Sequence, residues 1–161
     1  MKNREYYTNG NLKAEYERNE RGEKEGYELL YYESGVLKAE YHYKAGKLHG
    51  VTKEYYENGN LVAEGNYRNG MLEGLSRIYY ESGKLKAESS YKNDALDGLC
   101  KMYYESGQKF AIENYKNDLK NGDYYMYYEN GNLGIKAFFV NNKREGTVEF
   151  YEKDGKKIEN K

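Results

Sequence analysis

Glutamate side chains, which can act as general acids or bases, recur along this chain at a fixed spacing. The copies are Glu33, Glu57, Glu81, Glu105 and Glu129, which follow one another at a constant interval. If each copy adds two strands to a sheet, neighbouring carboxylates lie about 9–10 Å apart, close to the separation found in inverting glycosidases. A uniform row, however, lacks the two different environments that separate an acid from a base. We therefore interpret these glutamates as a solvated edge, with a cation-binding edge as the alternative.

Other reactive side chains are few. The chain has two histidines, His42 and His49, and one cysteine, Cys100. A metal site usually needs three or four ligands, and a nucleophilic cysteine needs an activating base. The sequence therefore predicts surface histidines and a buried structural cysteine. It predicts no catalytic residue, no metal ligand and no cofactor, so we expect that the protein is not an enzyme.

Tyrosine is the strongest candidate for binding. The chain has 22 tyrosines, and tyrosine and arginine are favoured anchors of protein interfaces. One tyrosine column runs beside cationic residues, and the candidates for binding a protein partner are Tyr55, Arg77, Tyr79, Lys101, Tyr103 and Tyr127. Stacking of the cations on the rings within the sheet is the alternative. We expect no nucleic-acid partner, because the formal net charge is −1.

The elements that position these side chains follow from a tandem repeat. Two glycine series have the same step as the glutamates, one from Gly26 to Gly146 and one from Gly35 to Gly155. Each copy carries two turn signals, such as Asn58-Gly59 and Asn69-Gly70, which supply the positive φ angles of primed hairpin turns. No proline interrupts the ladder. We predict an all-β fold: an elongated, twisted antiparallel meander of about six 24-residue hairpin repeats and about thirteen strands.

The first turn of a repeat predicts the register of one strand pair. A two-residue turn at Asn58-Gly59 places Tyr56 opposite Leu61 and Gly50 opposite Tyr67. The glycine leaves space that a ring on the facing strand can cover. We therefore expect the recurring glycines to serve as seats for aromatic rings.

The second turn predicts the register of the next pair. A two-residue turn at Asn69-Gly70 places Tyr67 opposite Leu72 and Ala63 opposite Ser76. Both registers put the same residues on the same side of the sheet, because side chains alternate along a strand. The sequence thus predicts an apolar face rich in leucine and tyrosine and a more polar face that carries the candidate binding residues.

Composition and the chain ends complete the expectations. Charged residues make up 33% of the chain and apolar residues 38%, so the core should be thin. We predict a single domain over residues 1–161, with an atypical N-terminal unit at 1–25 and a truncated cap at 147–161. No signal peptide or membrane-spanning run is visible, which favours the cytoplasm. The two edge strands of an open array leave self-association possible.

A family resemblance adds to this reading. The segment that runs from Tyr55 to Gly74, YYENGNLVAEGNYRNGMLEG, resembles the variant MORN repeat of bacteria, and about six copies cover nearly the whole chain. Bacterial proteins built from such repeats resemble the YwqK family of toxin–antitoxin antitoxins, which implies a binding or immunity role with a toxin as the partner. The first-described MORN repeats occur at membrane junctions and beside lipid kinases. They imply a lipid-associated scaffold as the alternative.

Overall fold

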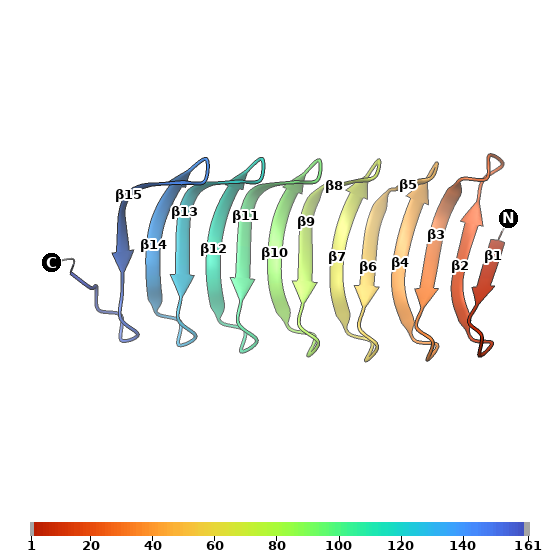
Figure 1. The fold of residues 1–161 in the computed structure, drawn as a ribbon, viewed down its shortest axis with the longest axis horizontal. Coiled ribbons are helices and arrows are strands. Elements are labelled where there is room, and N and C mark those ends of the chain that lie inside the picture. The colour runs from red at the N-terminus through yellow and green to blue at the C-terminus, as the bar shows by residue number, and fades with distance from the viewer. Residues whose placement is uncertain (1, 160–161) are drawn as a thin grey trace. The chain divides into compact units, whose positions relative to one another are not determined.

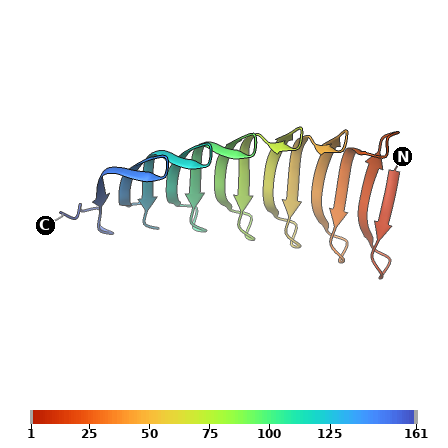
Figure 2. The same cartoon turned by 45° about the horizontal axis from the view of Figure 1, so that its top comes forward.

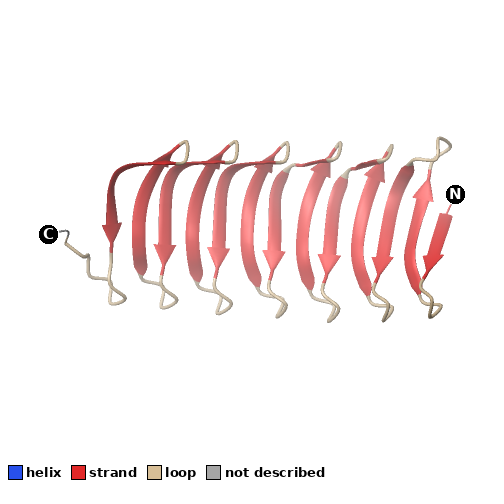
Figure 3. Ribbon diagram, viewed as in Figure 1, coloured by secondary structure: helices blue, strands red, loops and turns tan. Residues whose placement is uncertain are grey.

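A computed structural model describes residues 2–159, and these residues form strands, turns and loops without any helix (Figure 3). The backbone divides into two compact units, one ending at Gly83 and the other beginning at Lys84. Within each unit the strands pair in the order of the chain, always antiparallel (Figure 1). The predicted all-β meander is confirmed. Residues 1, 160 and 161, which belong to the predicted terminal units, lie outside the described residues.

Seven long strands and two short ones build the first unit. The long strands are β1 (Lys2–Tyr6), β2 (Leu12–Arg18), β3 (Lys24–Tyr31), β4 (Leu37–Lys44), β6 (Gly50–Tyr55), β7 (Leu61–Arg68) and β9 (Gly74–Tyr79). The short strands β5 (Lys47–Leu48) and β8 (Met71–Leu72) pair with β4 and β7 beside the turns.

Six long strands build the second unit. They are β10 (Leu85–Lys92), β11 (Ala95–Tyr103), β12 (Lys109–Lys116), β13 (Leu119–Tyr127), β14 (Leu133–Val140) and β15 (Lys143–Phe150). The long strands of the two units together match the predicted number of about thirteen.

The turns that follow a single aromatic residue have two residues, as predicted. Asn69 and Gly70 have φ angles of 56° and 87°, and the equivalent Asn93 and Asp94 have 50° and 69°. Positive φ at both central positions defines a type I′ turn, whose twist matches that of the flanking strands. Asparagine and aspartate tolerate this conformation better than other residues with a side chain.

The turns that follow a tyrosine pair have three residues, so the predicted two-residue turn at Asn58-Gly59 is wrong. The amide of Tyr56 donates to the carbonyl of Asn60 at 2.7 Å, and the turn glycine has a φ of 88°. This is a type I turn closed by a glycine bulge. The extra residue shifts the pairing by one beside the turn, and Tyr55 instead of Tyr56 lies opposite Leu61. A register shift between Glu54 and Tyr55 restores the predicted pairing beyond it, and Gly50 lies opposite Tyr67 as predicted.

The second predicted register is correct near the turn and wrong beyond it. Tyr67 lies opposite Leu72 as expected, but Ala63 lies opposite Ile78 instead of Ser76. Two additional residues are accommodated where β8 gives way to β9. Because a shift of two leaves every side chain on its original side, the predicted division into two faces survives.

The recurring glycines lie opposite aromatic residues as predicted, but a different feature explains them. Gly98 lies opposite Tyr115 and Gly122 opposite Phe139. Their φ angles are 118° and 121°, which disfavours any side chain. A Cβ atom at Gly122 would lie 3.0 Å from the Cβ of Asn114, and the atoms nearest such a Cβ at Gly98 belong to a serine rather than a ring. Backbone conformation at a bulge, and not a ring seat, requires these glycines.

Rows of directly opposite residues define the two faces of each unit. On the side that we name the alanine face, the central row contains Ala14, Leu30, Ala39, Glu54, Ala63 and Ile78 in the first unit and Ala87, Met102, Ala111, Met126, Ile135 and Phe150 in the second. On the opposite side, the charged face, it contains Glu15, Leu29, Glu40, Lys53, Glu64 and Arg77 in the first unit and Glu88, Lys101, Ile112, Tyr125, Lys136 and Glu149 in the second.

The alanine face holds the small core. Ala39 and Ala111 are each 1% exposed, and Ala14 and Ala137 are nearly as buried. Small residues alternate with larger ones across this row, and the long strands are bent along their length (Figure 2). No large side chain is fully buried among residues 2–159. The core is therefore thin, as the composition predicts.

Tyrosine hydroxyl groups connect successive repeats along one edge of each unit. The second tyrosine of a pair donates its hydroxyl to the backbone carbonyl of the tyrosine at the first position of the pair in the next repeat, which at Tyr151 has no second tyrosine after it. These bonds join Tyr7 to Tyr31, Tyr32 to Tyr55, Tyr56 to Tyr79, Tyr104 to Tyr127 and Tyr128 to Tyr151, at 2.7–3.0 Å. Asparagine side chains add similar bonds, as from Asn58 to the carbonyl of Glu81 at 3.0 Å. This tyrosine column is architectural, because each hydroxyl satisfies a main-chain acceptor.

Candidate functional site

The four predicted tyrosines lie at the ends of strands, whereas Arg77 and Lys101 lie in the central row of the charged face. Tyr55 and Tyr79 end β6 and β9, and their hydroxyls donate to glutamates of the charged row, Glu40 and Glu64. Tyr103 and Tyr127 end β11 and β13 in the second unit. All six predicted residues are half-buried. Each unit thus presents part of the predicted set, held in place by the sheet.

Glu64 connects two of the predicted binding residues in the first unit. Its Oε1 atom accepts from Arg77 Nη1 at 3.0 Å and from the Tyr79 hydroxyl at 3.0 Å. Burial alone would raise the pKa of Glu64, but the bonds from Arg77 and Tyr79 outweigh it and the pKa lies below its usual value. In the second unit, Lys101 Nζ pairs with Glu88 at 2.8 Å in the same way. The cations therefore bridge to carboxylates, an arrangement that neither of the two predicted readings described.

One pair of opposite charged residues in the charged row of the first unit, Lys53 and Glu40, forms no ion pair. Lys53 lies directly opposite Glu40, but Lys53 forms no ion pair with any of residues 2–159. Glu40 instead accepts a hydrogen bond from the Tyr55 hydroxyl at 3.0 Å. Burial, followed by this bond, raises the pKa of Tyr55 to about 12. Lys53 is consequently a half-buried ammonium group whose donors remain available to a ligand.

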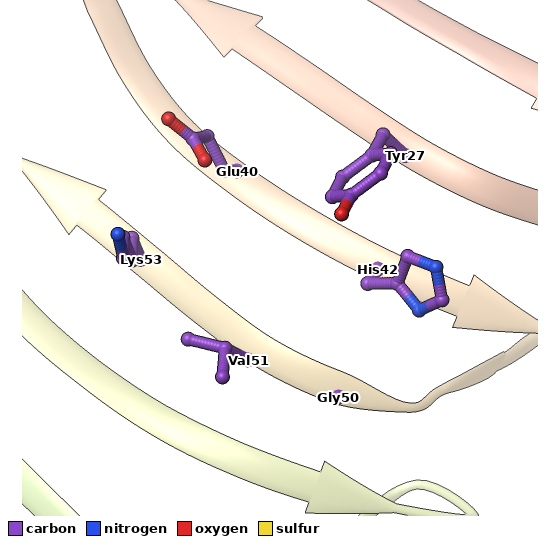
Figure 4. A pocket seen from close by; sticks show the side chains of 6 residues that line it. All are labelled: Tyr27, Glu40, His42, Gly50, Val51 and Lys53. Carbon is purple, nitrogen blue, oxygen red and sulfur yellow. The ribbon is translucent and has the colours of Figure 1, made fainter.

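A hollow opens above this pair of residues. Its volume is about 400 Å³, and it is lined by Tyr27 from β3, Glu40 and His42 from β4, and Gly50, Val51 and Lys53 from β6 (Figure 4). The Tyr27 and His42 rings meet edge to face, with their centroids 4.8 Å apart. The hollow thus combines an aromatic wall, an aliphatic wall and two charged groups.

The hydrogen bonding of His42 fixes the protons of its ring. Its Nδ1 atom contacts the backbone carbonyl of His49, which can only accept. Nδ1 must therefore carry a hydrogen, and in the neutral ring Nε2 is left as an acceptor. Both histidines are half-buried, and the Nδ1 atom of His49 is buried with no hydrogen-bond partner among residues 2–159.

A stripe of exposed apolar side chains crosses the charged face beside this hollow. Tyr27 is 64% exposed, Val51 54% and Leu75 43% in the first unit, and Leu99 takes the equivalent place in the second. We name Tyr27, Val51 and Leu75 the apolar stripe. None of these three residues was among the predicted binding residues. The signal was present, because each directly follows a glycine of the series that begins at Gly26.

The remaining predictions concern acids and the thiol. The glutamates from Glu33 to Glu129 lie in exposed turns, which confirms the solvated edge. Cys100 is half-buried and accepts from the Ser89 hydroxyl at 3.0 Å, and burial raises the pKa of the thiol. A raised pKa disfavours the nucleophilic thiolate. Residues 2–159 contain no group of three or more acidic, histidine or cysteine side chains placed to hold a metal ion.

Two carboxylates, one in each unit, are buried on the alanine face. Glu113 is 7% exposed and accepts from Lys120 Nζ at 2.6 Å and from the Tyr115 hydroxyl at 2.5 Å. Lys120 Nζ also lies 5.0 Å from the centroid of the Tyr124 ring. Glu28, 6% exposed, pairs with a lysine in the first unit. Because both acids are already satisfied, we interpret them as internal ion pairs of the sheet.

Comparison with protein families identifies the repeat. The model of the MORN repeat variant matches six segments, namely residues 2–19, 24–45, 48–69, 72–93, 96–117 and 120–141. The chain belongs to the MORN repeat variant family. The resemblance seen in the sequence is thereby confirmed at the level of this repeat. A comparison with functionally curated proteins found no match. Within residues 2–159, the MORN repeats include no helix of the length and apolar character needed to cross a membrane.

Proposed function

We propose that this MORN repeat protein acts by binding, without catalysis, and that its charged face docks a protein partner. The observation that carries the proposal is the apolar stripe, which exposes three side chains in one column beside half-buried tyrosines and cations. Scattered exposed apolar residues need no explanation, but an aligned group of them is typical of an interaction surface. Tyrosine and arginine beside it are favoured interface anchors.

The partner that we propose is a toxin, with this protein as a bacterial antitoxin or immunity protein that blocks it sterically. The support is the resemblance of the repeat array to YwqK-type antitoxins. Steric blocking needs only a preformed surface, and the charged face is held by the hydrogen bonds of Glu40 and Glu64. A partially preorganised surface loses less conformational entropy on binding than a flexible one.

Co-purification with the product of the neighbouring gene tests this proposal. The wild-type chain should retain the partner and rescue growth when the partner is expressed, whereas a Tyr79→Ala/Tyr103→Ala variant should do neither. Ile78→Ala is the matched control, because Ile78 is 46% exposed and adjoins Tyr79 but belongs to the alanine face. Failure of the wild type to bind or rescue with any neighbouring toxin candidate would refute the antitoxin role.

A lipid-associated scaffold is the second candidate. Exposed cations flank the type I′ turns of the first unit, at Lys44, Lys47 and Arg68. Basic residues near a surface attract anionic lipid headgroups, at about 1 kcal/mol per residue. Flotation with liposomes that contain phosphatidylserine measures this directly. Binding that weakens with added salt would favour this role, and absence of binding at low salt would eliminate it.

A further inference from the structure

The spacing of the apolar stripe points to a particular kind of partner segment. Tyr27, Val51 and Leu75 lie on β3, β6 and β9, so each is two strands from the next. Two strand spacings are about 9.6 Å, and the whole stripe therefore spans about 19 Å. A partner segment that contacts all three residues must therefore place side chains on one of its sides about every 9.6 Å.

Regular backbone conformations meet this requirement unequally. A polyproline II helix advances about 9.3 Å in three residues and returns each third side chain to the same side. In an α-helix the same side recurs after seven residues, or about 10.5 Å. Over the two intervals of the stripe, the helix positions would therefore be displaced from the stripe residues by about 2 Å. In a β-strand, residues on one side recur about every 6.6 Å. Polyproline II geometry fits the stripe best.

The donors around the stripe suit a backbone that has no internal hydrogen bonds. The carbonyl groups of a polyproline II segment are fully solvated, so a binding surface must offer donors to replace water. Three side chains near the stripe have donors that no hydrogen bond within residues 2–159 uses: the Tyr27 hydroxyl, Lys53 Nζ and the side-chain amide of Asn66. Asn66 lies directly opposite Val51, and Lys53 is two residues from it on β6.

The hollow supplies the space for an anchoring side chain. It lies between Tyr27 and Val51 over His42, and its volume of about 400 Å³ exceeds that of a single proline or leucine (Figure 4). Aromatic and aliphatic walls favour an apolar occupant. Aromatic-lined grooves that bind proline-rich segments use the same combination of rings and donors.

We infer that the apolar stripe binds a proline-rich segment of the partner protein in polyproline II conformation, with an apolar residue at every third position. The inference rests on the proposed function, since it assigns the chemistry of the partner at the charged face. The low conformational entropy of a proline-rich segment in solution reduces the cost of ordering it on the sheet.

Fluorescence anisotropy with synthetic peptides tests the inference. The probe is a nine-residue labelled peptide with proline or leucine at every third position. The control is a labelled peptide of the same composition in which the apolar residues stand at every second position. The first peptide should bind at least tenfold more tightly than the second. Val51→Asp should weaken its binding at least tenfold, because the carboxylate is buried against an apolar chain. Leu119→Asp, which changes an exposed leucine of the second unit in the same way, should leave binding unchanged.

The outcomes separate this inference from the proposed function. Equal binding of the two peptides, no binding of either, or unchanged binding by Val51→Asp overturns the inference. If Val51→Asp still captures a protein partner that Tyr79→Ala/Tyr103→Ala loses, the docking function stands and the proline-rich segment falls. Circular dichroism and the urea midpoint of each variant show whether the fold is retained, and Val51→Ala serves in place of Val51→Asp if that variant unfolds.

Discussion

Removing Lys120 alone should destabilise the second unit more than removing it together with Glu113 does. The two side chains form a buried ion pair on the alanine face, at 2.6 Å. The array itself contains the neutral replacement, because one repeat earlier the equivalent positions hold Leu96 and Ser89. The double variant Lys120→Leu/Glu113→Ser therefore copies a combination that the same sheet already accommodates.

The magnitudes follow from burial. Lys120→Leu leaves a carboxylate that is 7% exposed, with the Tyr115 hydroxyl as its remaining partner among residues 2–159. Breaking a buried pair this way costs about 3–5 kcal/mol, and about 3 kcal/mol is expected here because the lysine side chain is 34% exposed. Glu113→Ser leaves the ammonium group a path to water and costs about 1 kcal/mol. If the effects were independent, the double variant would lose about 4 kcal/mol; the coupling of neighbours should reduce this by about 2–3 kcal/mol.

Urea unfolding of the wild type, both single variants and the double variant measures this coupling. Because repeat arrays need not unfold in one step, hydrogen exchange of β12 and β13 amides should accompany the midpoints. Two results would refute the reasoning. Additive losses would mean that the pair is not coupled, and a stable Lys120→Leu variant would mean that Glu113 reaches another partner or is protonated at little cost.

Three further predictions follow from the same contacts. Gly122→Ala should lower the free energy of unfolding by roughly 2 kcal/mol, because φ is 121° there and the added Cβ would lie 3.0 Å from the Cβ of Asn114. Gly146→Ala, where the space is open, should lower it by roughly 1 kcal/mol. Equal urea midpoints of the two variants would contradict this difference. Tyr104→Phe, which removes the 2.9 Å bond to the Tyr127 carbonyl, should cost about 1 kcal/mol in the same assay. The pKa of Tyr55 is raised from 10.0 to about 12, so its contribution to stability is complete below pH 10 and is lost as the pH rises through 12. Tyr55→Phe should therefore flatten the alkaline fall in the urea midpoint, and an unchanged slope would count against the raised pKa.

Local chemistry explains which parts of the fold could be predicted. Asn69-Gly70 forms the expected type I′ turn because both residues tolerate positive φ. Asn58-Gly59 has the same two letters but forms a three-residue turn. There the Asn58 side chain accepts from the amide of Asn60 at 2.9 Å and donates to the carbonyl of Glu81 at 3.0 Å. The second of these contacts comes from the next repeat, and a local pattern does not contain it.

The candidate site was harder to predict, because what distinguishes its residues is their solvent exposure, and exposure depends on how the strands pair. Arg77 and Tyr79 were expected on the polar face and lie there, but their common acceptor, Glu64, follows from a register that includes bulges. Val51 and Tyr27 look like ordinary strand residues in the sequence. Only the structure shows that the sheet leaves them uncovered.

The apolar stripe is the feature of the array that architecture explains least. The second tyrosines of the pairs recur because each satisfies a backbone carbonyl of the next repeat, and the glycines recur because a bulge needs positive φ. Exposing Val51 and Leu75 gains little burial for the fold. Further along the same column the chain places Asp123 and Thr147, so the sheet does not require an apolar residue there. A column that the fold leaves free, and that is nevertheless apolar at three successive repeats of the first unit, supports the proposal of a bound partner better than it is explained by stability.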